Sequence, residues 1–313
     1  MKEALIAGCL TFAAGVMFQY ALTVLQRRLH VSQVQKSYGI GIDVEIKGST
    51  PTMGGVVFLL LAVAVLSVQR DLTALLFWSL PIASGIVGFV DDWLKVVHKS
   101  SEGFRSLRKL AAQTVIAFIW VCWMWKRNGI YLWPGLEVSF WFSFPFAMLA
   151  TVGMMNAVNV TDGLDGLAGG AFMISLCVLG YLMPGTDFGF TVFAVLFALT
   201  ASFLLFNVRP ALIFMGDTGS HFLGGALVAL CLQYGMLLAV IPAGFLFGIE
   251  LFSSAVQILG IRGFDRKIFK MAPLHHHFQR MGWDETTVTS RFLIIHAVGA
   301  AFLAALCVKI LGI

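Results

Sequence analysis

The chain contains ten long apolar segments, and these constrain its fold more than any other feature. A membrane-spanning helix needs roughly 20 mainly apolar residues. Segments of this kind lie near residues 4–25, 51–69, 72–93, 110–126, 139–157, 164–184, 187–206, 214–233, 236–259 and 288–311. Only 12% of the residues are charged and the mean hydropathy is +0.88, both far from the usage of soluble domains. The sequence therefore predicts an all-α, polytopic membrane protein of about ten transmembrane helices, with residues 1–313 forming one integral-membrane domain.

The basic residues are distributed unevenly between the two sides of this predicted bundle. Sixteen of the 21 Lys and Arg residues lie in alternate loops, beginning with the loop after the first apolar segment. By the positive-inside rule these loops face the cytoplasm, and both termini lie on the outer side. Because such loops usually act as topology signals, the net charge of +5 does not argue for nucleic acid as a partner.

An acidic pair, Asp91 and Asp92, follows the third apolar segment, with Lys95 and Lys99 after it. If that helix continues beyond the membrane, Asp92, Lys95 and Lys99 share one face, and Asp91 projects about 100° away. The ordinary interpretation is a helix end with ion pairs between neighbouring turns. Two adjacent carboxylates repel each other unless a cation binds, which favours a functional site.

A polar, glycine-rich segment over residues 156–170 joins the fifth and sixth apolar segments. Its Asn159, Asp162 and Asp165 repeat every three residues, so helical or tight-turn geometry places them on one side. The glycines beside the aspartates allow a ligand to approach the backbone. The alternative is a polar turn between two spans, because Asn, Asp and Gly are ordinary turn residues.

A third carboxylate, Asp217, lies in a glycine-flanked loop at the start of the eighth apolar segment, shortly after Asn207 and Phe214. It could cap the following helix. It also suits Mg²⁺, which takes oxygen ligands and is commonly held by one or two carboxylates together with substrate phosphates.

Three consecutive histidines, His275, His276 and His277, lie in the basic ninth loop. Adjacent histidines on a helix point about 100° apart. The chain has neither a His-Glu-x-x-His pattern nor cysteine partners, so zinc is disfavoured. Hydrogen bonding to phosphate or to a sugar is the preferred interpretation, and a histidine run without function is the alternative.

Two further polar pairs lie near this predicted cytoplasmic face. Lys47 and Thr50 have the chemistry of phosphate contacts, although their loop lacks the P-loop pattern. Glu250 and Gln257 are seven residues apart and share one face of the ninth segment, where they could form an interhelical contact or line a polar cavity. Carboxylates that converge with lysines and histidines indicate a metal-assisted reaction on phosphate groups.

Five motifs stand in the predicted cytoplasmic loops. They are Thr50-Pro-Thr-Met-Gly-Gly, Asp91-Asp92-x-x-Lys95, Asn156-Ala-Val-Asn-Val-Thr-Asp-Gly-Leu-Asp-Gly-Leu, Phe214-Met-Gly-Asp-Thr-Gly-Ser and Pro273-Leu-His-His-His-Phe. In this order, over about residues 45–290, they resemble the bacterial phospho-N-acetylmuramoyl-pentapeptide transferase family. The wider family of polyprenyl-phosphate N-acetylhexosamine-1-phosphate transferases is similar in its aspartates.

The resemblance implies an enzyme that transfers phospho-MurNAc-pentapeptide from UDP-MurNAc-pentapeptide to undecaprenyl phosphate with Mg²⁺ as cofactor. The products would be UMP and lipid I, made at the inner leaflet of the bacterial plasma membrane in the first membrane step of peptidoglycan synthesis. The implied partners are the two substrates and the lipid bilayer, without nucleic acid. The oligomeric state stays open, a homodimer included.

Two alternatives differ in function. A sibling enzyme would transfer GlcNAc-1-phosphate to a polyprenyl phosphate. A transporter would use intramembrane charges as an ion path. It would place polar residues along several spans, whereas Glu250 is nearly alone at mid-depth.

The resemblance also implies roles for individual residues. Asp217 would be the main Mg²⁺ ligand, and Asp91 or Asp92 would position or deprotonate the acceptor phosphate, with either as a further metal ligand. Asn159, Asp162 and Asp165 would hold the uridine and diphosphate side. The other substrate-binding residues would be Lys47, Thr50, Lys95, Lys99, Lys109, Asn207, Phe214, Gly216, Gln257, His275, His276 and His277.

Overall fold

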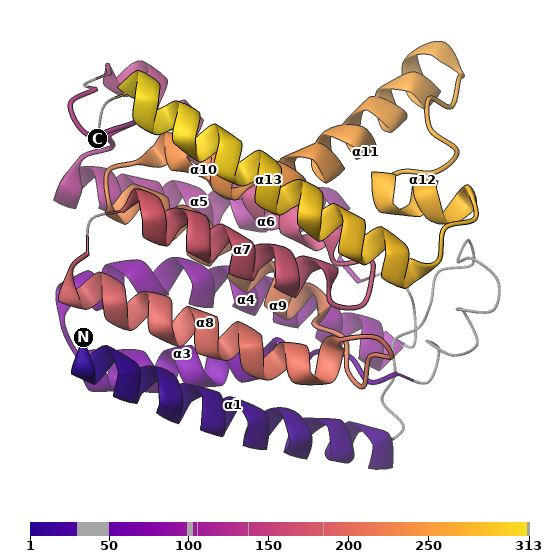
Figure 1. Cartoon of the computed structure of the whole chain (residues 1–313), viewed down its shortest axis with the longest axis horizontal. Coiled ribbons are helices and arrows are strands. Elements are labelled where there is room, and N and C mark those ends of the chain that lie inside the picture. Colours follow the sequence, from indigo (N-terminus) through magenta and orange to yellow (C-terminus); the bar gives the residue numbers. More distant parts are fainter. Residues whose placement is uncertain (30–49, 99–102, 105, 137, 184, 312–313) are drawn as a thin grey trace.

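The structure is a computed structural model, and it describes residues 1–29, 50–98, 103–104, 106–136, 138–183 and 185–311. The regular elements in these ranges are helices, arranged in one bundle (Figure 1). They are α1 (Lys2–Arg28), α3 (Val56–Gln69), α4 (Leu72–His98), α5 (Ser106–Asn128), α6 (Phe140–Thr161), α7 (Leu167–Leu182), α8 (Asp187–Asn207), α9 (Gly216–Gln233), the 3-10 turn η1 (Leu237–Ala239), α10 (Val240–Ala243), α11 (Phe245–Phe264), α12 (Leu274–Arg280) and α13 (Glu285–Leu311).

Every one of the ten predicted apolar segments contains a helix, so the all-α prediction is confirmed. Among the described residues, seven helices are long and apolar enough to cross a membrane, namely α1, α4, α5, α6, α8, α11 and α13. The apolar helices α3 and α7 are shorter, with 14 and 16 residues. The helical bundle is consistent with a polytopic membrane protein.

Helix α9 lies in the middle of the bundle. Its residues from Thr218 to Leu232 are all buried, and from Phe222 to Leu232 the helix is apolar on every side, as expected for a buried helix. It packs against α4 and α6. The approach of α4 is close because Gly88 leaves no side chain there: a Cβ atom would lie 2.1 Å from the carbonyl oxygen of Asp217. This contact connects the start of α9 to the end of α4.

The ninth apolar segment differs from the prediction. One helix was expected over residues 236–259, but the chain forms η1 and the short α10, and α11 begins only at Phe245. Pro242 cannot donate a backbone hydrogen bond, and Gly244 is a poor helix former, so the helix is interrupted between them. Beyond this interruption α11 diverges from α13 toward its C-terminal end, and α12 lies nearby (Figure 1).

The N-terminal end of α1 and the C-terminal end of α13 lie on the same side of the bundle (Figure 1). The N-terminus and the C-terminal end of α13 are at the left of Figure 1, whereas α12 lies at the opposite end.

Candidate active site

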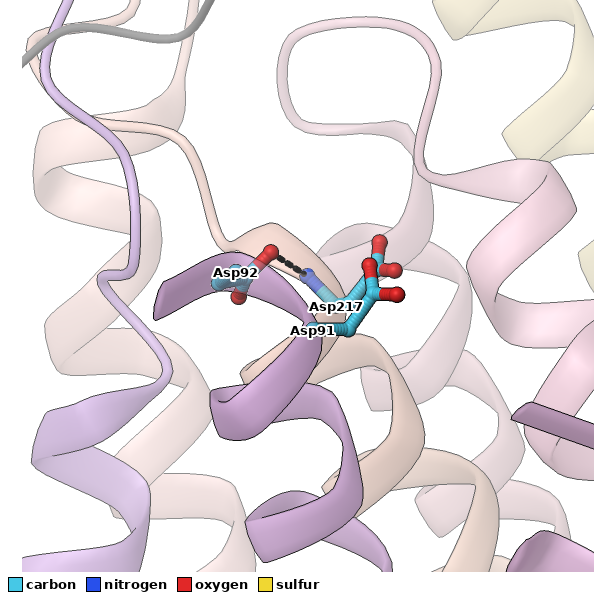
Figure 2. Close-up of side chains that lie close together, drawn as sticks. All are labelled: Asp91, Asp92 and Asp217. Atoms are coloured by element: carbon cyan, nitrogen blue, oxygen red, sulfur yellow. Dashed lines mark hydrogen bonds between the residues drawn. The ribbon is translucent and has the colours of Figure 1, made fainter. Parts of the chain in front are cut away.

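Three carboxylates from two helices meet at the α4–α9 contact. Asp91 and Asp92 lie near the end of α4, and Asp217 lies in the first turn of α9. Each offers an oxygen atom within 4.8 Å of the others. Figure 2 shows the carboxylates of Asp91 and Asp217 next to each other, while that of Asp92 lies on the other side of the α4 end. The predicted convergence of the acidic pair with Asp217 is therefore present in the structure.

The carboxylate of Asp92 accepts hydrogen bonds from the first residues of α9. One carboxylate oxygen accepts from the backbone N–H of Asp217 (3.1 Å), and the other accepts from the backbone N–H (2.9 Å) and the hydroxyl (2.7 Å) of Thr218. The first N–H groups of a helix have no partner within it. Asp92 therefore caps α9 from a neighbouring helix. The N-cap residue of α9 is Met215 and Asp217 is the second residue of the helix, so the interpretation of Asp217 as its N-cap is wrong.

Asp217 accepts hydrogen bonds from three side chains. The Nζ atom of Lys109 lies 2.5 Å from its Oδ2, and that of Lys95 lies 3.0 Å from the same atom. The amide of Asn159 donates to its Oδ1 at 2.8 Å and to the hydroxyl of Ser220 at 2.9 Å. The Asp217 side chain is 14% exposed, so the carboxylate is still accessible from one side.

Asp91 faces the same cluster. Its Oδ2 lies 2.6 Å from the Nζ of Lys95, and its Oδ1 accepts from the backbone N–H of Phe104 at 2.7 Å. Lys95 lies further from Asp92, at 3.8 Å. The sequence placed Lys95 on the face of Asp92, but its long side chain reaches the i−4 aspartate instead. Lys95 thus bridges the carboxylates of Asp91 and Asp217.

The expectation that Asn159, Asp162 and Asp165 share one side is only partly met. Asn159 contacts Asp217, whereas Asp165 accepts from the backbone N–H of Ala211 at 3.1 Å. Helix α6 ends at Thr161 between them, so the helical spacing does not continue. Asp162 is half-buried at this helix end.

Asn207 and Glu285 hold the loops beside Asp165. Asn207 accepts from the backbone N–H of Gly166 at 3.0 Å and donates to the carbonyl of Ile213 at 2.9 Å. Glu285 accepts from the backbone N–H of Asp165 at 2.8 Å and forms an ion pair with Arg209. The sequence interpretation missed Glu285, although Asp284-Glu285 is a second pair of adjacent acids beside an apolar segment.

The three histidines lie on α12, and His275 contacts α11. Buried Glu250 accepts from the backbone N–H of His275 at 3.2 Å, and its Oε2 lies 3.3 Å from the Nδ1 of that ring. His276 contacts Gln279 at 2.8 Å, and His277 accepts from the backbone N–H of Lys270 at 3.0 Å. The three rings therefore point to different partners, as adjacent residues on a helix must.

Gln257 holds the loop before α12. Its side-chain oxygen accepts from the backbone N–H groups of Ile268 and Phe269, and its amide donates to the carbonyl of Phe269. Glu250 and Gln257 do share one face of α11, and that face contacts the segment that ends in α12. His275 also approaches the glycine-rich segment over residues 156–170, because a Cβ on Gly163 would lie 2.4 Å from the Nε2 of His275.

The Thr50 motif supports the turn before Asp217. The backbone N–H of Gly54 donates to the carbonyl of Phe214 at 2.9 Å, and the N–H of Phe214 donates to the carbonyl of Pro51 at 2.8 Å. Thr50 is buried, and Phe214 is half-buried. Gly216 has a φ of 74°, and a Cβ there would lie 2.5 Å from the Asp92 carboxylate, so this position requires glycine. Lys47 and Lys99 lie outside the described residues.

The cluster has the composition of a divalent-cation site. Mg²⁺ binds oxygen atoms at about 2.0–2.1 Å, and carboxylate oxygens gathered from Asp91, Asp92 and Asp217 provide suitable ligands. Lys95 and Lys109 beside them can contact phosphate groups as well as carboxylates. The arrangement can therefore hold a cation and a phosphate-bearing substrate at the same place.

The comparison with protein families identifies the class. The model of "Glycosyl transferase family 4" matches residues 72–235, from the start of α4 to just beyond α9. This stretch contains all three carboxylates and both lysines of the cluster.

Curated relatives narrow the class further. A protein of Kosmotoga olearia is 33% identical over an alignment that covers 100% of this chain and 98% of the relative. A protein of Desulforudis audaxviator is 35% identical over 94% of this chain and 98% of the relative. A protein of Maricaulis maris is 36% identical over 88% of this chain and 84% of the relative. Each is named phospho-N-acetylmuramoyl-pentapeptide-transferase. Within glycosyl transferase family 4, the chain belongs to the phospho-N-acetylmuramoyl-pentapeptide-transferase family.

Proposed function

We propose that the protein transfers phospho-MurNAc-pentapeptide from UDP-MurNAc-pentapeptide to undecaprenyl phosphate, with UMP and lipid I as products. The single observation that carries the proposal is the cluster of Asp91, Asp217, Lys95 and Lys109 at one end of an apolar helical bundle. Such a site suits one substrate that is soluble and phosphorylated and another that is anchored in lipid. The names of the relatives point to the same reaction.

The proposal includes a location and an orientation. The protein is a multi-pass protein of the bacterial plasma membrane with about ten spans, and the site faces the cytoplasm. The uneven distribution of basic residues supports this orientation. Cysteines replacing Thr286, beside α12, and Ser139, before α6, test it in a background free of native cysteine. A membrane-impermeant maleimide added to intact cells should label only the cysteine at position 139, and labelling at both positions would contradict the orientation.

Mg²⁺ is the proposed cofactor, held by Asp217 with Asp91. Bound there, it would polarise the phosphoryl oxygens of the donor and neutralise charge that develops during transfer. Asp92 contributes indirectly, because its hydrogen bonds to α9 fix where the Asp217 carboxylate lies. Lys95 and Lys109 would contact the phosphates of the substrates.

The donor is assigned to the region between the cluster and α12. On one side of this region, Asn159, Asn207 and Gly216 lie at the ends of helices, and Asp162, Asp165 and Phe214 lie in the loops beside them. The histidines lie on the other side, and the contact of Gly163 with His275 connects the two. Gln257 keeps the α12 loop in place. Thr50, Lys47 and Lys99 complete the proposed set.

Transfer is proposed to occur by direct attack. An oxygen of the lipid phosphate forms a bond to the phosphorus that carries the sugar, and the bond from that phosphorus to the bridging oxygen breaks, so UMP leaves with that oxygen. The second pKa of a phosphate monoester is about 6, so the acceptor is largely ionised near neutral pH without a strong base. Asp91 then orients the acceptor beside Lys95. A phospho-aspartate route is the alternative, and it would require one carboxylate to leave its present hydrogen bonds.

Purified protein in detergent with undecaprenyl phosphate provides the test. Release of UMP should occur with UDP-MurNAc-pentapeptide and should be much slower with UDP-GlcNAc. Preference for UDP-GlcNAc would identify the sibling activity instead.

The mechanism has a separate test, since exchange of labelled UMP into the donor should be absent from rigorously delipidated protein. Exchange there, lost in Asp91→Asn or Asp92→Asn, would establish a covalent intermediate.

A further inference from the structure

The interruption between α10 and α11 leaves backbone groups that a continuous helix would pair internally. We call the segment from Val240 to Phe245 the α10–α11 break. Leu246 is the second residue of α11, so its N–H has no partner within that helix. This place lies inside the apolar bundle, where an unpaired backbone group is costly. Partners from other helices are therefore needed.

Two buried polar side chains supply those partners. The N–H of Leu246 donates to the Nδ1 atom of His296 on α13 at 3.3 Å. The hydroxyl of Ser175 on α7 donates to the carbonyl of Ala243 at 2.5 Å. His296 is 0% exposed and Ser175 is 1% exposed, so neither side chain is accessible from bulk solvent.

The two side chains also contact each other, and the hydrogen bonds fix the histidine tautomer. Because Nδ1 of His296 accepts from Leu246, its proton is on Nε2. That atom lies 3.1 Å from the Ser175 hydroxyl and 3.1 Å from the carbonyl of Ala171. A neutral imidazole thus joins α7 and α13 to the first turn of α11.

Close packing also holds the α10–α11 break in position. A Cβ on Gly299, one turn after His296, would lie 2.2 Å from the ring of Phe245 at the start of α11. A Cβ on Gly244 would lie 2.5 Å from the side chain of Met154 on α6. The first residue of α11 is therefore enclosed by α6 and α13 as well as hydrogen-bonded.

The direction of α11 matters because its outer part carries the contacts to α12. Glu250 and Gln257 lie 6 and 13 residues beyond Gly244, and they bind the backbone of His275 and of residues 268–269. At 1.5 Å per residue, Gln257 is roughly 20 Å from the break, so a tilt of about 10° would move it by roughly 3 Å. A movement of that size would break its hydrogen bonds.

We infer that Ser175 and His296 are positioning residues that hold the α10–α11 break, and that through α11 they set the place of α12 and its histidines. Nothing in the cluster of carboxylates contacts them. The inference rests on the proposed function in one respect, namely that α12 binds the donor. The geometric part, control of the α11 direction by two buried polar residues, is independent of it.

Three variants and a matched control test the inference. His296→Leu has a side chain of similar size without the hydrogen bonds, and Ser175→Ala removes the hydroxyl. His296→Gln offers both an acceptor and a donor, so it should restore the contacts. Thr200→Val is the control, because Thr200 is 0% exposed and its hydroxyl, within the described part of the chain, donates only to the carbonyl of Leu196 in its own helix.

The first measurement is a distance between spin labels, which does not depend on activity. Labels at Phe264 on α11 and Leu149 on α6 replace exposed side chains. The unmodified sequence, His296→Gln and Thr200→Val should give one narrow distribution. His296→Leu and Ser175→Ala should give a shifted or broadened one. Unchanged distance distributions in both His296→Leu and Ser175→Ala would overturn the inference. If His296→Leu does not fold, the distribution of Ser175→Ala alone provides the test.

The second measurement is kinetic. The KM for the UDP-sugar should rise about tenfold in Ser175→Ala and His296→Leu, the change expected from loss of one net hydrogen bond. The kcat should change little, and His296→Gln should recover the original KM. A shifted distance distribution with an unchanged KM would refute the connection to the donor. Absence of turnover with every donor in the unmodified protein would instead refute the proposed function, and the distances would still decide the geometric part.

Discussion

Gly88→Ala tests whether the close approach of α4 to α9 creates the site. The added methyl group would lie 2.1 Å from the carbonyl oxygen and 2.4 Å from the carbonyl carbon of Asp217. Both are backbone atoms, so no side chain can rotate away. Ordinary contact requires about 3.4 Å, and the start of α9 must therefore move away from α4 by roughly 1 Å.

The displaced atoms belong to Asp217, so the expected effect falls mainly on turnover. A misplacement of about 1 Å can cost roughly a hundredfold in rate, and we expect kcat to fall by about that factor. Overpacking costs about 1–3 kcal/mol of stability, offset by about 1 kcal/mol from the better helix propensity of Ala. The thermal unfolding temperature should thus fall by a few degrees at most, and the loss of activity should exceed the loss of stability.

The matched control is Gly153→Ala in α6, where a Cβ would have no atom within 4 Å. It makes the same chemical change in a helix without overlap, and we expect normal turnover and equal or slightly higher stability. The assay is UMP release in detergent together with thermal unfolding of both variants. A Gly88→Ala protein with the kcat of the control would refute the reasoning, since the α4–α9 approach would then not determine the position of Asp217.

Three further predictions concern individual contacts. Asp217→Asn should lower UMP release by at least about a hundredfold at any Mg²⁺ concentration, because it removes a charge from the cluster. Asp187→Asn, on an exposed residue at the start of α8, should have no effect. Near-normal turnover of Asp217→Asn would contradict the metal assignment. Asp92→Asn should lower the unfolding temperature more than Asp91→Asn does, since loss of a helix cap costs about 1 kcal/mol; equal unfolding temperatures would argue against the capping role. Gly163→Ala should raise the KM for the UDP-sugar more than it lowers kcat, because its methyl group would overlap the His275 ring, and an unchanged KM would separate α12 from donor binding.

The sequence predicted the helices because their signal is local. An apolar run of sufficient length is visible without any knowledge of its neighbours, and all ten such runs contain helices. The break near Gly244 was missed because Pro242 and Gly244 lie within an otherwise apolar run. Hydropathy alone does not register the loss of one backbone donor.

The site was predictable to the extent that charge is expensive beside a membrane. Asp91, Asp92 and Asp217 attract attention at the ends of apolar segments, and they do converge. Their division of roles was not predictable, because Asp92 is distinguished from Asp91 only by the helix that begins next to it. Glu285 and the Ser175–His296 contact depend on packing between segments far apart in sequence, which no local pattern contains.

The structure separates the proposed site into two parts with different mechanical supports. The carboxylates depend on the α4–α9 contact, where glycine and a capping aspartate hold α4 against the buried helix α9. The histidines depend on α11, a helix that diverges from the bundle and is held at its first turn (Figure 1). A close, rigid contact suits groups that must meet the reacting phosphorus in one geometry. A helix held at one end suits a surface that must admit and release a large nucleotide-sugar. Substitutions at the α4–α9 contact should therefore act on kcat, and those at the α10–α11 break should act on KM.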